Sequence, residues 1–358
     1  MTTLAVLTSG GDAPGMNPAL RALGKVCAQS GITLLGVERG YEGLLEGAFR
    51  PLVTPGEGGG APRFDRELEG CQGWGGTFLG SARSARFREA AGRAEAAAQL
   101  AEAGVDGLVV IGGNGSLAGA AALAEEHELR VVGLPASIDN DIGCTGLSIG
   151  VDTALNTIIE ACDRIADTAR AHRRAFIVEV MGRECGYLAM AAAIAAGADA
   201  VLMREQGRDE RAVVEAVEKT VRAGFDRGKK RVLVIKSEGV RVPCTKLVRE
   251  LNARIPGDHV RATVLGHVVR GGAPSYMDRR IASRLAFQAV RAFEEGQTGT
   301  MTAWRATAEG GSKTVDPTVR LFPLAQVLEE TRAVLDGTSA VMRWRLEMME
   351  RVAGVLGV

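Results

Sequence analysis

The chain has 358 residues, enough for two domains of ordinary size, and 46% of them are hydrophobic, so substantial cores can form. Aromatic residues make up only 4%, while glycine (47 residues) and alanine are abundant, a composition typical of tightly packed α/β layers rather than of a β-sandwich. The 43 basic and 43 acidic residues give a formal net charge of zero, which argues against a nucleic-acid partner, although local arginine clusters could bind small phosphates.

Cysteine and histidine usage excludes further classes. The six cysteines are scattered, without a CxxC pair or a metal-ligand spacing, which indicates reduced core residues and a cytoplasmic protein. The four histidines are also dispersed, so no zinc site is expected. No apolar run is long enough to span a bilayer, and the chain begins directly in an expected strand, without a signal peptide.

The first expected element is an apolar strand over residues 4–7 that runs into the turn TSGGDAPGMN and then into a helix. Glycines let backbone N–H groups approach an anion, and a helix N-terminus favours negative charge, so this turn is a candidate phosphate loop. It matches neither the GxGxxG fingerprint nor a Walker A motif. A purely structural tight turn explains a glycine pair about as often as a ligand does.

A second strand is expected over residues 32–37, and the Gly/Pro-rich stretch 55–62 after it is expected to lie at the surface. The segment 75–93 then carries arginines that precede and enter a helix, at positions 83, 86 and 88. Cations usually prefer the other end of a helix, so these arginines favour a nearby anion over a merely solvated helix start.

Two apolar runs, LVVIGG (residues 108–113) and VVGLP (residues 131–135), each end in a turn of small and polar residues. Buried parallel strands deliver chemistry at their C-terminal ends in this way, so we expect a site where the two ends meet. The first end has the features of a phosphate-binding turn. Its glycines allow close backbone approach, and Ser116 follows at the start of a helix.

The second end places Ser137, Asp139 and Asp141 at alternate positions. In an extended segment their side chains leave on one side. A hydroxyl and two carboxylates on one face suit a general base beside a metal or phosphate ligand.

Strands and helices alternate through the remaining chain, with a helix expected over residues 150–168 and strands over 176–187 and 232–239. This alternation predicts parallel, doubly wound sheets. The segment 261–290 places His267 among arginines, which indicates an anion site better than it indicates a core histidine. The tail, residues 323–358, is expected to be helical and amphipathic, with no recognisable chemistry.

The motifs TSGGDAPGMN, GGTFLGSAR, VVIGGNGS, GLPASIDNDI, VEVMGRECG, RATVLGH and VVRGG occur in this order across residues 4–290. Together they resemble those of the bacterial ATP-dependent 6-phosphofructokinases. The resemblance implies an α/β fold of two Rossmann-like α/β/α domains with mainly parallel sheets. It implies an ATP- and magnesium-binding domain over residues 1–150 plus about 268–315, and a sugar-phosphate-binding domain over residues 151–267 plus about 316–358.

The same resemblance implies a glycolytic kinase that transfers the γ-phosphoryl group of ATP to the 1-hydroxyl of fructose 6-phosphate, with Mg²⁺. Asp139 aligns with the base, and Ser137 stands where the family usually has threonine. Arg83 and Arg183 align with cations that stabilise the transferring charge, and the Gly11 amide with a γ-phosphate contact. The family is usually homotetrameric, so at least a dimer is expected.

Two binding sets follow from the alignment with the family. The ATP-contacting positions are Gly11, Tyr41, Arg83, Ser84, Arg88, Gly113, Asn114, Gly115, Ser116 and Gly119. The fructose 6-phosphate positions are Ser137, Asp139, Arg174, Met181, Gly182, Arg183, Glu238, Arg261, His267 and Arg270. Among the latter, Arg174 and Arg261 match residues that reach the phosphate from a neighbouring subunit. Small residues at Gly115 and Ala136 favour ATP over pyrophosphate as the donor.

The chain departs from the family pattern at Asn114, where GGNGS replaces GGDGS and its magnesium-ligand aspartate. Asp141 is then the acidic ligand that remains, so weaker magnesium retention and a lower rate are expected. The benign alternative is that ATP oxygens and water hold the metal.

A second departure concerns regulation by ADP or phosphoenolpyruvate. The effector positions are Arg21, Lys25, Asp199 and Lys229. Ala166 stands where an effector-binding arginine is expected, which should weaken an anionic effector. Two other functions stay open. One is a weakly active or non-catalytic regulatory subunit that binds sugar phosphate beside a catalytic paralogue, and the other is a pyrophosphate-dependent phosphofructokinase.

Overall fold

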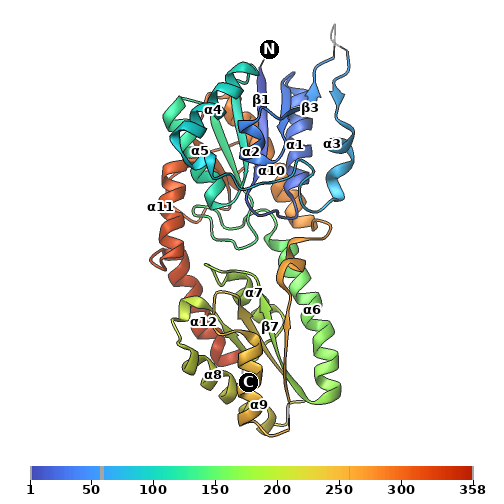
Figure 1. Ribbon diagram of the computed structural model, residues 1–358, viewed down its shortest axis with the longest axis vertical. Helices are drawn as coiled ribbons and strands as arrows, with labels where there is room; N and C mark the ends of the chain where they lie inside the picture. Colours follow the sequence, from blue (N-terminus) through green and yellow to red (C-terminus); the bar gives the residue numbers. More distant parts are fainter. Residues whose placement is uncertain (1, 57–59, 258, 357–358) are drawn as a thin grey trace. The chain divides into compact units, whose positions relative to one another are not determined.

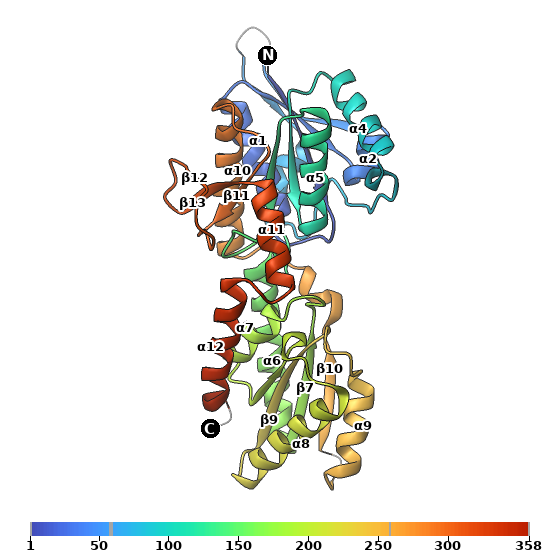
Figure 2. The same ribbon diagram turned by 90° about the vertical axis from the view of Figure 1, so that its left-hand side faces the viewer.

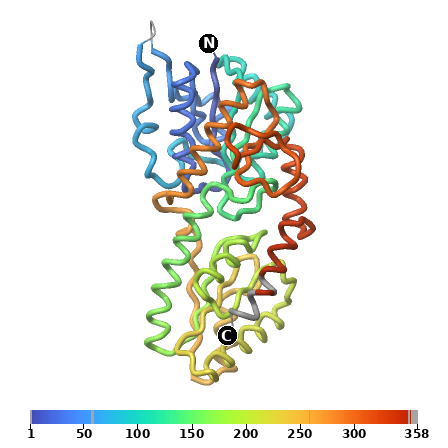
Figure 3. Tube along the Cα trace, turned by 180° about the vertical axis from the view of Figure 1, so that it is seen from behind, coloured from blue at the N-terminus to red at the C-terminus, as the bar shows by residue number. Residues whose placement is uncertain are grey.

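The computed structural model describes residues 2–56, 60–257 and 259–356, and the chain forms two compact units. Unit 1 comprises residues 1–138, 142–153 and 270–333, and unit 2 comprises residues 139–141, 154–269 and 334–358. The chain therefore passes from one unit to the other and back, as Figure 3 traces. Residues 316–333 lie in unit 1, whereas the expected division placed them in the second domain. Which unit binds which ligand stays a prediction.

Unit 1 is built on a nine-stranded sheet in the order β12-β13-β11-β6-β5-β1-β2-β3-β4. Its central strands β2, β1, β5, β6 and β11 pair in parallel, and β3, β4, β12 and β13 add antiparallel edges. The strands are β1 (Thr3–Ser9), β2 (Thr33–Val37), β3 (Phe49–Thr54), β4 (Arg63–Phe64), β5 (Gly107–Gly112), β6 (Val131–Pro135), β11 (Thr300–Trp304), β12 (Ser312–Lys313) and β13 (Val319–Pro323). Every residue of β5 and β6 is buried, which explains their unbroken apolar runs.

Helices cover both faces of this sheet, as Figure 2 shows. α1 (Met16–Gln29) packs with α10 (Tyr276–Glu294) on one face, while α2 (Gly40–Leu45), α4 (Ala90–Glu102) and α5 (Asn114–His127) share a core on the other. The remaining elements of the unit are α3 (Arg66–Gly70), the short 3₁₀ helices η2 (Cys71–Gly73) and η3 (Arg86–Arg88), and α11 (Leu324–Leu335). The stretch 55–62 joins β3 to β4, and its residues 57–59 lie outside the described part of the chain.

Unit 2 contains a four-stranded, wholly parallel sheet in the order β10-β7-β9-β8. Its strands are β7 (Arg174–Val180), β8 (Ala200–Leu202), β9 (Arg231–Ser237) and β10 (Val260–Val264). Its helices are α6 (Val151–His172), α7 (Tyr187–Ala195), η4 (Arg204–Gln206), α8 (Glu210–Asp226), α9 (Cys244–Arg254), η5 (Gly266–Arg270) and α12 (Ala340–Leu356). α8 and α9 share a core with the sheet, and α12 packs against α7 (Figure 1).

One sequence-based boundary was wrong. The strand expected over residues 176–187 ends at Val180, because Gly182 adopts φ 115°, a conformation that ends an extended run. The tail is helical as expected and forms two helices, α11 and α12, on either side of Gly337, where φ is 75°. Within the described part of the chain, no helix is long and apolar enough to cross a membrane.

The cysteines behave as the composition predicted. All six have free, buried thiols. Burial raises the pKa of Cys27 to about 12, so its thiol stays protonated and unreactive at neutral pH. These residues therefore act as small apolar side chains of the core.

Asp278, at the start of α10, is a fully buried carboxyl that accepts three hydrogen bonds. Its donors are the Gly150 and Thr153 backbone N–H groups, each at 2.8 Å, and the Thr153 hydroxyl at 2.6 Å. Burial raises the pKa of Asp278 to about 6, although the hydrogen bonds oppose this shift. The carboxyl is therefore mostly ionised at pH 7 and ties α10 to the first turn of α6.

We expect Asp278→Ala to lower the free energy of unfolding at pH 7 by about 2–4 kcal/mol, because buried donors lose their acceptor. Asp278→Asn keeps one carbonyl acceptor and should lose less. Urea unfolding followed by circular dichroism compares both variants with the wild type. Equal stability of all three chains would contradict this role for Asp278.

Candidate functional site

Three neighbouring strands of unit 1 end at the same level. Ser9 of β1 lies opposite Gly112 of β5, which in turn lies opposite Pro135 of β6. The Ala136 N–H donates to the Gly112 carbonyl at 2.9 Å and extends this alignment by one residue. The glycine turns after β1 and β5 and Ser137 after β6 therefore emerge at one edge of the sheet, as the sequence predicted.

The turn after β5 leads directly into α5, whose first helical residue is Asn114. The preceding Gly113 provides no side-chain cap, and its carbonyl accepts the Ser116 and Leu117 N–H groups, each at 3.0 Å. Gly115 is exposed, and a Cβ there would meet nothing within 4 Å. Asn114 is half-buried. The first turn of α5 is thus open and suited to an anion.

Tyr41, with the Phe87 ring stacked on it, holds this turn in place. The Tyr41 hydroxyl donates to the Ser116 carbonyl at 2.7 Å, and its ring stacks on Phe87 with centroids 3.8 Å apart. A Cβ on Gly119 would lie 2.9 Å from Phe87, so only glycine fits beneath the rings. Burial raises the pKa of Tyr41. Tyr41 and Gly119 therefore shape the turn, and their direct contact with ATP stays a prediction.

The arginines before α4 remain available to a ligand. The side chains of Arg83 and Arg88 are exposed. Ser84 has a local role, because its hydroxyl accepts a 3.2 Å hydrogen bond from the Phe87 N–H. Phe87, which the sequence analysis did not single out, is thus fixed by both Ser84 and Tyr41.

Arg270 lies against the turn after β1. A Cβ on Gly11 would be 2.6 Å from the Arg270 Nη1, and this nitrogen donates to the Asp12 carbonyl at 3.1 Å. A side chain at position 11 would therefore displace the end of the Arg270 side chain from this turn. Arg270 belongs to unit 1, unlike the other predicted sugar-phosphate residues of the 181–267 segment.

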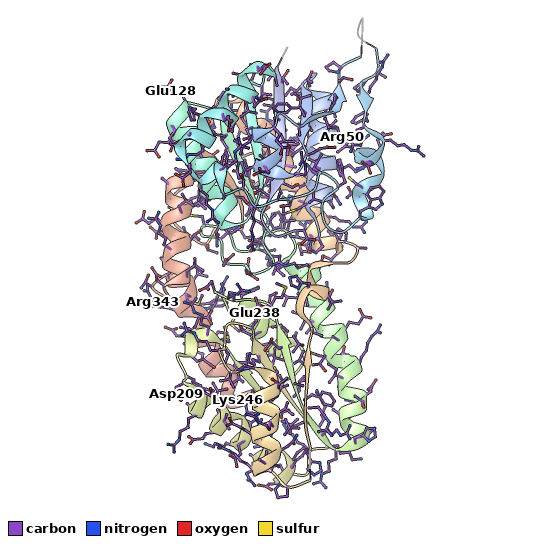
Figure 4. All side chains as sticks on the ribbon, viewed as in Figure 1. Arg50, Glu128, Asp209, Glu238, Lys246 and Arg343 are labelled. Atoms are coloured by element: carbon purple, nitrogen blue, oxygen red, sulfur yellow. The ribbon has the colours of Figure 1, made fainter. Side chains whose placement is uncertain are left out.

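A second set of strand ends occurs in unit 2. Val180 of β7 lies opposite Ser237 of β9, and the Glu238 N–H donates to the Val180 carbonyl at 2.9 Å. β10 pairs with β7 on its other side, and His267 follows β10. Glu238, labelled in Figure 4, therefore shares one sheet edge with His267 and with the predicted residues Met181, Gly182 and Arg183. Arg183 and His267 are exposed, whereas Met181 is buried.

Ser237 fixes the turn after β7. Its hydroxyl donates to the Gly182 carbonyl at 2.5 Å and accepts from the Gly239 N–H at 3.2 Å. A Cβ on Gly182 would lie 2.4 Å from the Cys185 carbonyl oxygen, so this turn requires glycine. One hydroxyl thereby joins the two loops that carry Met181, Gly182 and Glu238.

Lys236, one residue earlier, forms a buried ion pair. Its side chain is 1% exposed, and Nζ lies 2.6 Å from Glu179 Oε2 on β7. The Cys244 thiol lies 3.3 Å from the same oxygen. The sequence analysis did not select Lys236 or Ser237, although a lysine inside an apolar strand signals a buried partner.

The segment 137–141 completes the second strand end described by the sequence analysis. Ser137 and Asp139 are half-buried, and Asp141 is 8% exposed. Asn140 between the two carboxylates has φ 50°, a left-handed conformation that is uncommon for residues other than glycine. The segment is therefore not extended as the sequence predicted, since residues 138 and 139 form a turn, and strand alternation does not set the directions of Ser137, Asp139 and Asp141.

Comparison with known proteins identifies the family of this chain. A family model described as Phosphofructokinase matches residues 3–293. The chain belongs to the phosphofructokinase family. The predicted resemblance and the two-domain α/β fold with mainly parallel sheets are thereby confirmed.

Relatives of known name cover nearly the whole chain. The ATP-dependent 6-phosphofructokinase of Thermotoga neapolitana is 42% identical over 337 residues, which are 92% of this chain and 100% of the relative. ATP-dependent 6-phosphofructokinase 1 of Thermus thermophilus is 40% identical over 335 residues, which are 93% of this chain and 96% of the relative.

Solved phosphofructokinase structures share the fold. Pichia pastoris phosphofructokinase matches with a TM-score of 0.84 and 31% identity, and the match covers 98% of this chain but only 39% of that longer chain. Pyrophosphate-dependent phosphofructokinase from Marinobacter aquaeolei matches with a TM-score of 0.75 and 18% identity, over 98% of this chain and 91% of that one. The latter likeness concerns the fold alone.

Two arginines of the predicted sugar-phosphate set lie elsewhere on the sheet of unit 2. Arg174 begins β7 and Arg261 lies near the start of β10. At about 3.3 Å per residue, the start of β7 is roughly 20 Å from the turn after its end. Within one chain these arginines therefore do not join Met181 and Glu238. This placement is consistent with the expected role of both arginines toward a neighbouring subunit, which stays a prediction.

The residues predicted for the phosphofructokinase effector site form two separate pairs. Lys229 Nζ lies 2.7 Å from Asp199 Oδ1 in unit 2. In unit 1, Arg21 donates to the Glu69 carbonyl at 3.3 Å, and Lys25 lies 3.3 Å from the Glu69 carboxylate. An effector would have to compete with these carboxylates for the lysines. Effector binding stays a prediction.

We expect Lys236→Met to lower the free energy of unfolding of unit 2 by about 2–4 kcal/mol, because Glu179, only 18% exposed, would lose its cation. The double variant Lys236→Met/Glu179→Gln removes both charges and should recover part of this loss. Urea unfolding of the three chains measures the difference. A double variant less stable than the single one would show that the ion pair does not couple these strands.

Proposed function

We propose that this chain catalyses the ATP-dependent phosphorylation of fructose 6-phosphate to fructose 1,6-bisphosphate, a step of glycolysis. The strongest support is the 42% identity over 92% of the chain to a protein named ATP-dependent 6-phosphofructokinase. The open first turn of α5 and the sheet edge that carries Met181, Glu238 and His267 are consistent with this activity. The enzyme would then act in the cytoplasm, where glycolysis takes place.

In the proposed mechanism Asp139 accepts the proton of the sugar 1-hydroxyl. The oxygen attacks the γ-phosphorus, a new O–P bond forms, and the bond from this phosphorus to the β,γ-bridging oxygen breaks, which releases ADP. Arg83 and Arg183 stabilise the charge on the transferring phosphoryl group, and the Gly11 amide hydrogen-bonds to it. Ser137 provides a hydroxyl beside the same group.

ATP is the proposed donor because Gly115, in the first turn of α5, has no side chain. The space beside Gly115 is open, since a Cβ there meets no atom within 4 Å. A larger side chain at this position would fill the space that the α-phosphate of ATP requires. We therefore favour the ATP-dependent reaction over pyrophosphate-dependent transfer.

Magnesium is the proposed cofactor, with Asn114 and Asp141 as its protein ligands. Both side chains offer oxygen atoms, the donor type that this hard cation prefers. Within the described residues, no group of three or more histidine, cysteine, aspartate or glutamate side chains is arranged to hold a metal. Phosphate oxygens and water are the proposed remaining ligands, as is usual for magnesium beside nucleotide phosphates. When bound, the ion neutralises charge on the β- and γ-phosphates.

We also propose a homo-oligomer, a tetramer or at least a dimer, in which Arg174 and Arg261 bind the sugar phosphate of a neighbouring subunit. Their position away from Met181 and Glu238 supports this arrangement. The neutral Asn114 favours a second candidate function, a sugar-phosphate-binding regulatory subunit with little turnover. Such a subunit would associate with a catalytic paralogue.

The test of function is the initial rate of ADP formation from ATP and fructose 6-phosphate, titrated with Mg²⁺. We expect turnover in the wild type and a decrease of about 100- to 10,000-fold in Asp139→Asn, because the amide cannot accept the proton. Fructose 6-phosphate binding by calorimetry should be retained in the variant. Binding without turnover in the wild type at any Mg²⁺ concentration would favour the regulatory subunit.

Asn114→Asp should restore a charge to the magnesium shell. If that charge is worth about 2–4 kcal/mol in the transition state, the rate at limiting Mg²⁺ rises by roughly 30- to 1,000-fold. Asn114→Gln, which keeps a neutral carboxamide, serves as the matched control and should show no gain. An unchanged rate and Mg²⁺ half-saturation in Asn114→Asp would mean that phosphates and water hold the metal.

A further inference from the structure

α12 follows the part of the chain that the family model matches, and it carries a buried arginine. Arg345 is only 6% exposed. Arginine is almost never buried unless partners satisfy its charge and its N–H groups. The contacts of Arg345 therefore indicate what α12 does in unit 2.

The Arg345 guanidinium binds the chain beside the two predicted catalytic carboxylates. Its Nη1 and Nη2 both donate to the Asn140 carbonyl, at 3.2 Å and 3.3 Å. Nη1 also lies 3.7 Å from the Cys185 sulfur, and the guanidinium carbon is 4.5 Å from the centroid of the Tyr187 ring. Two N–H groups of one guanidinium on the same oxygen restrain the position of this carbonyl.

Asn140 needs such a partner because of its backbone conformation. The residue is 2% exposed and has φ 50°. The left-handed conformation costs energy for a residue with a side chain, although asparagine tolerates it better than most, so a contact on the peptide helps to hold it. Since Asn140 lies between Asp139 and Asp141, its peptide geometry sets the direction in which both carboxylates leave the chain.

α12 is itself packed against other residues of unit 2, so the backbone that carries Arg345 is fixed. Met342 of α12 packs against Cys185 and Val334, and Tyr187 and Leu346 border this apolar cluster. The Ser339 hydroxyl accepts the Met342 N–H at 2.9 Å at the start of the helix. Cys185 also follows the turn at Gly182, so one helix contacts both the 139–141 segment and the region after β7.

We propose that Arg345 is a positioning residue that holds the Asn140 backbone so that Asp139 and Asp141 keep their reactive orientations. This inference rests on the proposed function, which gives Asp139 the role of base and Asp141 that of metal ligand. Arg345 touches no reacting atom. Its removal acts through Asn140, and α12 thereby becomes part of the catalytic machinery of unit 2.

The test compares Arg345→Met, Arg345→Lys and the control Arg343→Met. Arg343 lies on the same helix, is exposed, and donates to the Thr338 carbonyl (Figure 4). Its substitution repeats the loss of one charge from α12 without touching Asn140. Steady-state kinetics are measured with ATP, Mg²⁺ and fructose 6-phosphate, at a temperature where thermal melts show all four chains folded.

We expect kcat of Arg345→Met to fall by about 10- to 100-fold, the effect of a small displacement of a catalytic group. KM for fructose 6-phosphate should change by less than about threefold, since the contacts that position Met181, Gly182 and Glu238 do not involve Arg345. Arg345→Lys retains a cation that can donate to Asn140, so it should keep more of kcat. Arg343→Met should match the wild type.

A folded Arg345→Met chain whose kcat equals that of an active wild type would overturn this inference alone. The same holds if Arg343→Met loses as much activity, because general weakening of α12 would then explain the effect, and if Arg345→Lys is as impaired as Arg345→Met. A wild-type chain that forms no ADP would instead overturn the proposed function, and this inference with it.

Discussion

The register of the parallel strands is the constraint on which both units depend. Ser9, Gly112 and Pro135 end three neighbouring strands at one level, and Val180 and Ser237 do the same in the second sheet. Backbone hydrogen bonds fix this register along each strand, and a slip by one residue would turn every side chain to the other face. The starting points of the loops that carry the predicted site residues are therefore fixed by the sheets.

The parts of the site that depend on local chain features could be predicted from the sequence. The glycine turn before Ser116 lies within a few residues of a buried strand, so its spacing alone indicates how it emerges. The extended geometry expected from Ser137 to Asp141 was wrong, because the chain turns at residues 138–139 and Asn140 is left-handed. The same approach overextended β7 past Val180, because the sequence does not show that the backbone already turns at Gly182, where φ is 115°.

The supporting interactions could not be predicted, because their partners are far apart in the chain. Lys236 in an apolar strand signals that a buried anion exists, but it does not say that Glu179 provides it. Arg345 resembles any cation on the polar face of an amphipathic helix until the fold brings Asn140 to it. Such long-range pairs follow from the packing of whole elements, which no local pattern contains.

The order of the strands also bears on how the chain reaches its fold during synthesis. In unit 1, β6 ends at Pro135, and its outer neighbour β11 begins only at Thr300, after nearly all of unit 2 has been made. Until β11 arrives, the apolar strand β6 presents an unpaired edge, which is a template for association with other chains. Unit 2 can thus complete its sheet first, and the edge of β6 waits for its partner while the intervening residues of the chain are made.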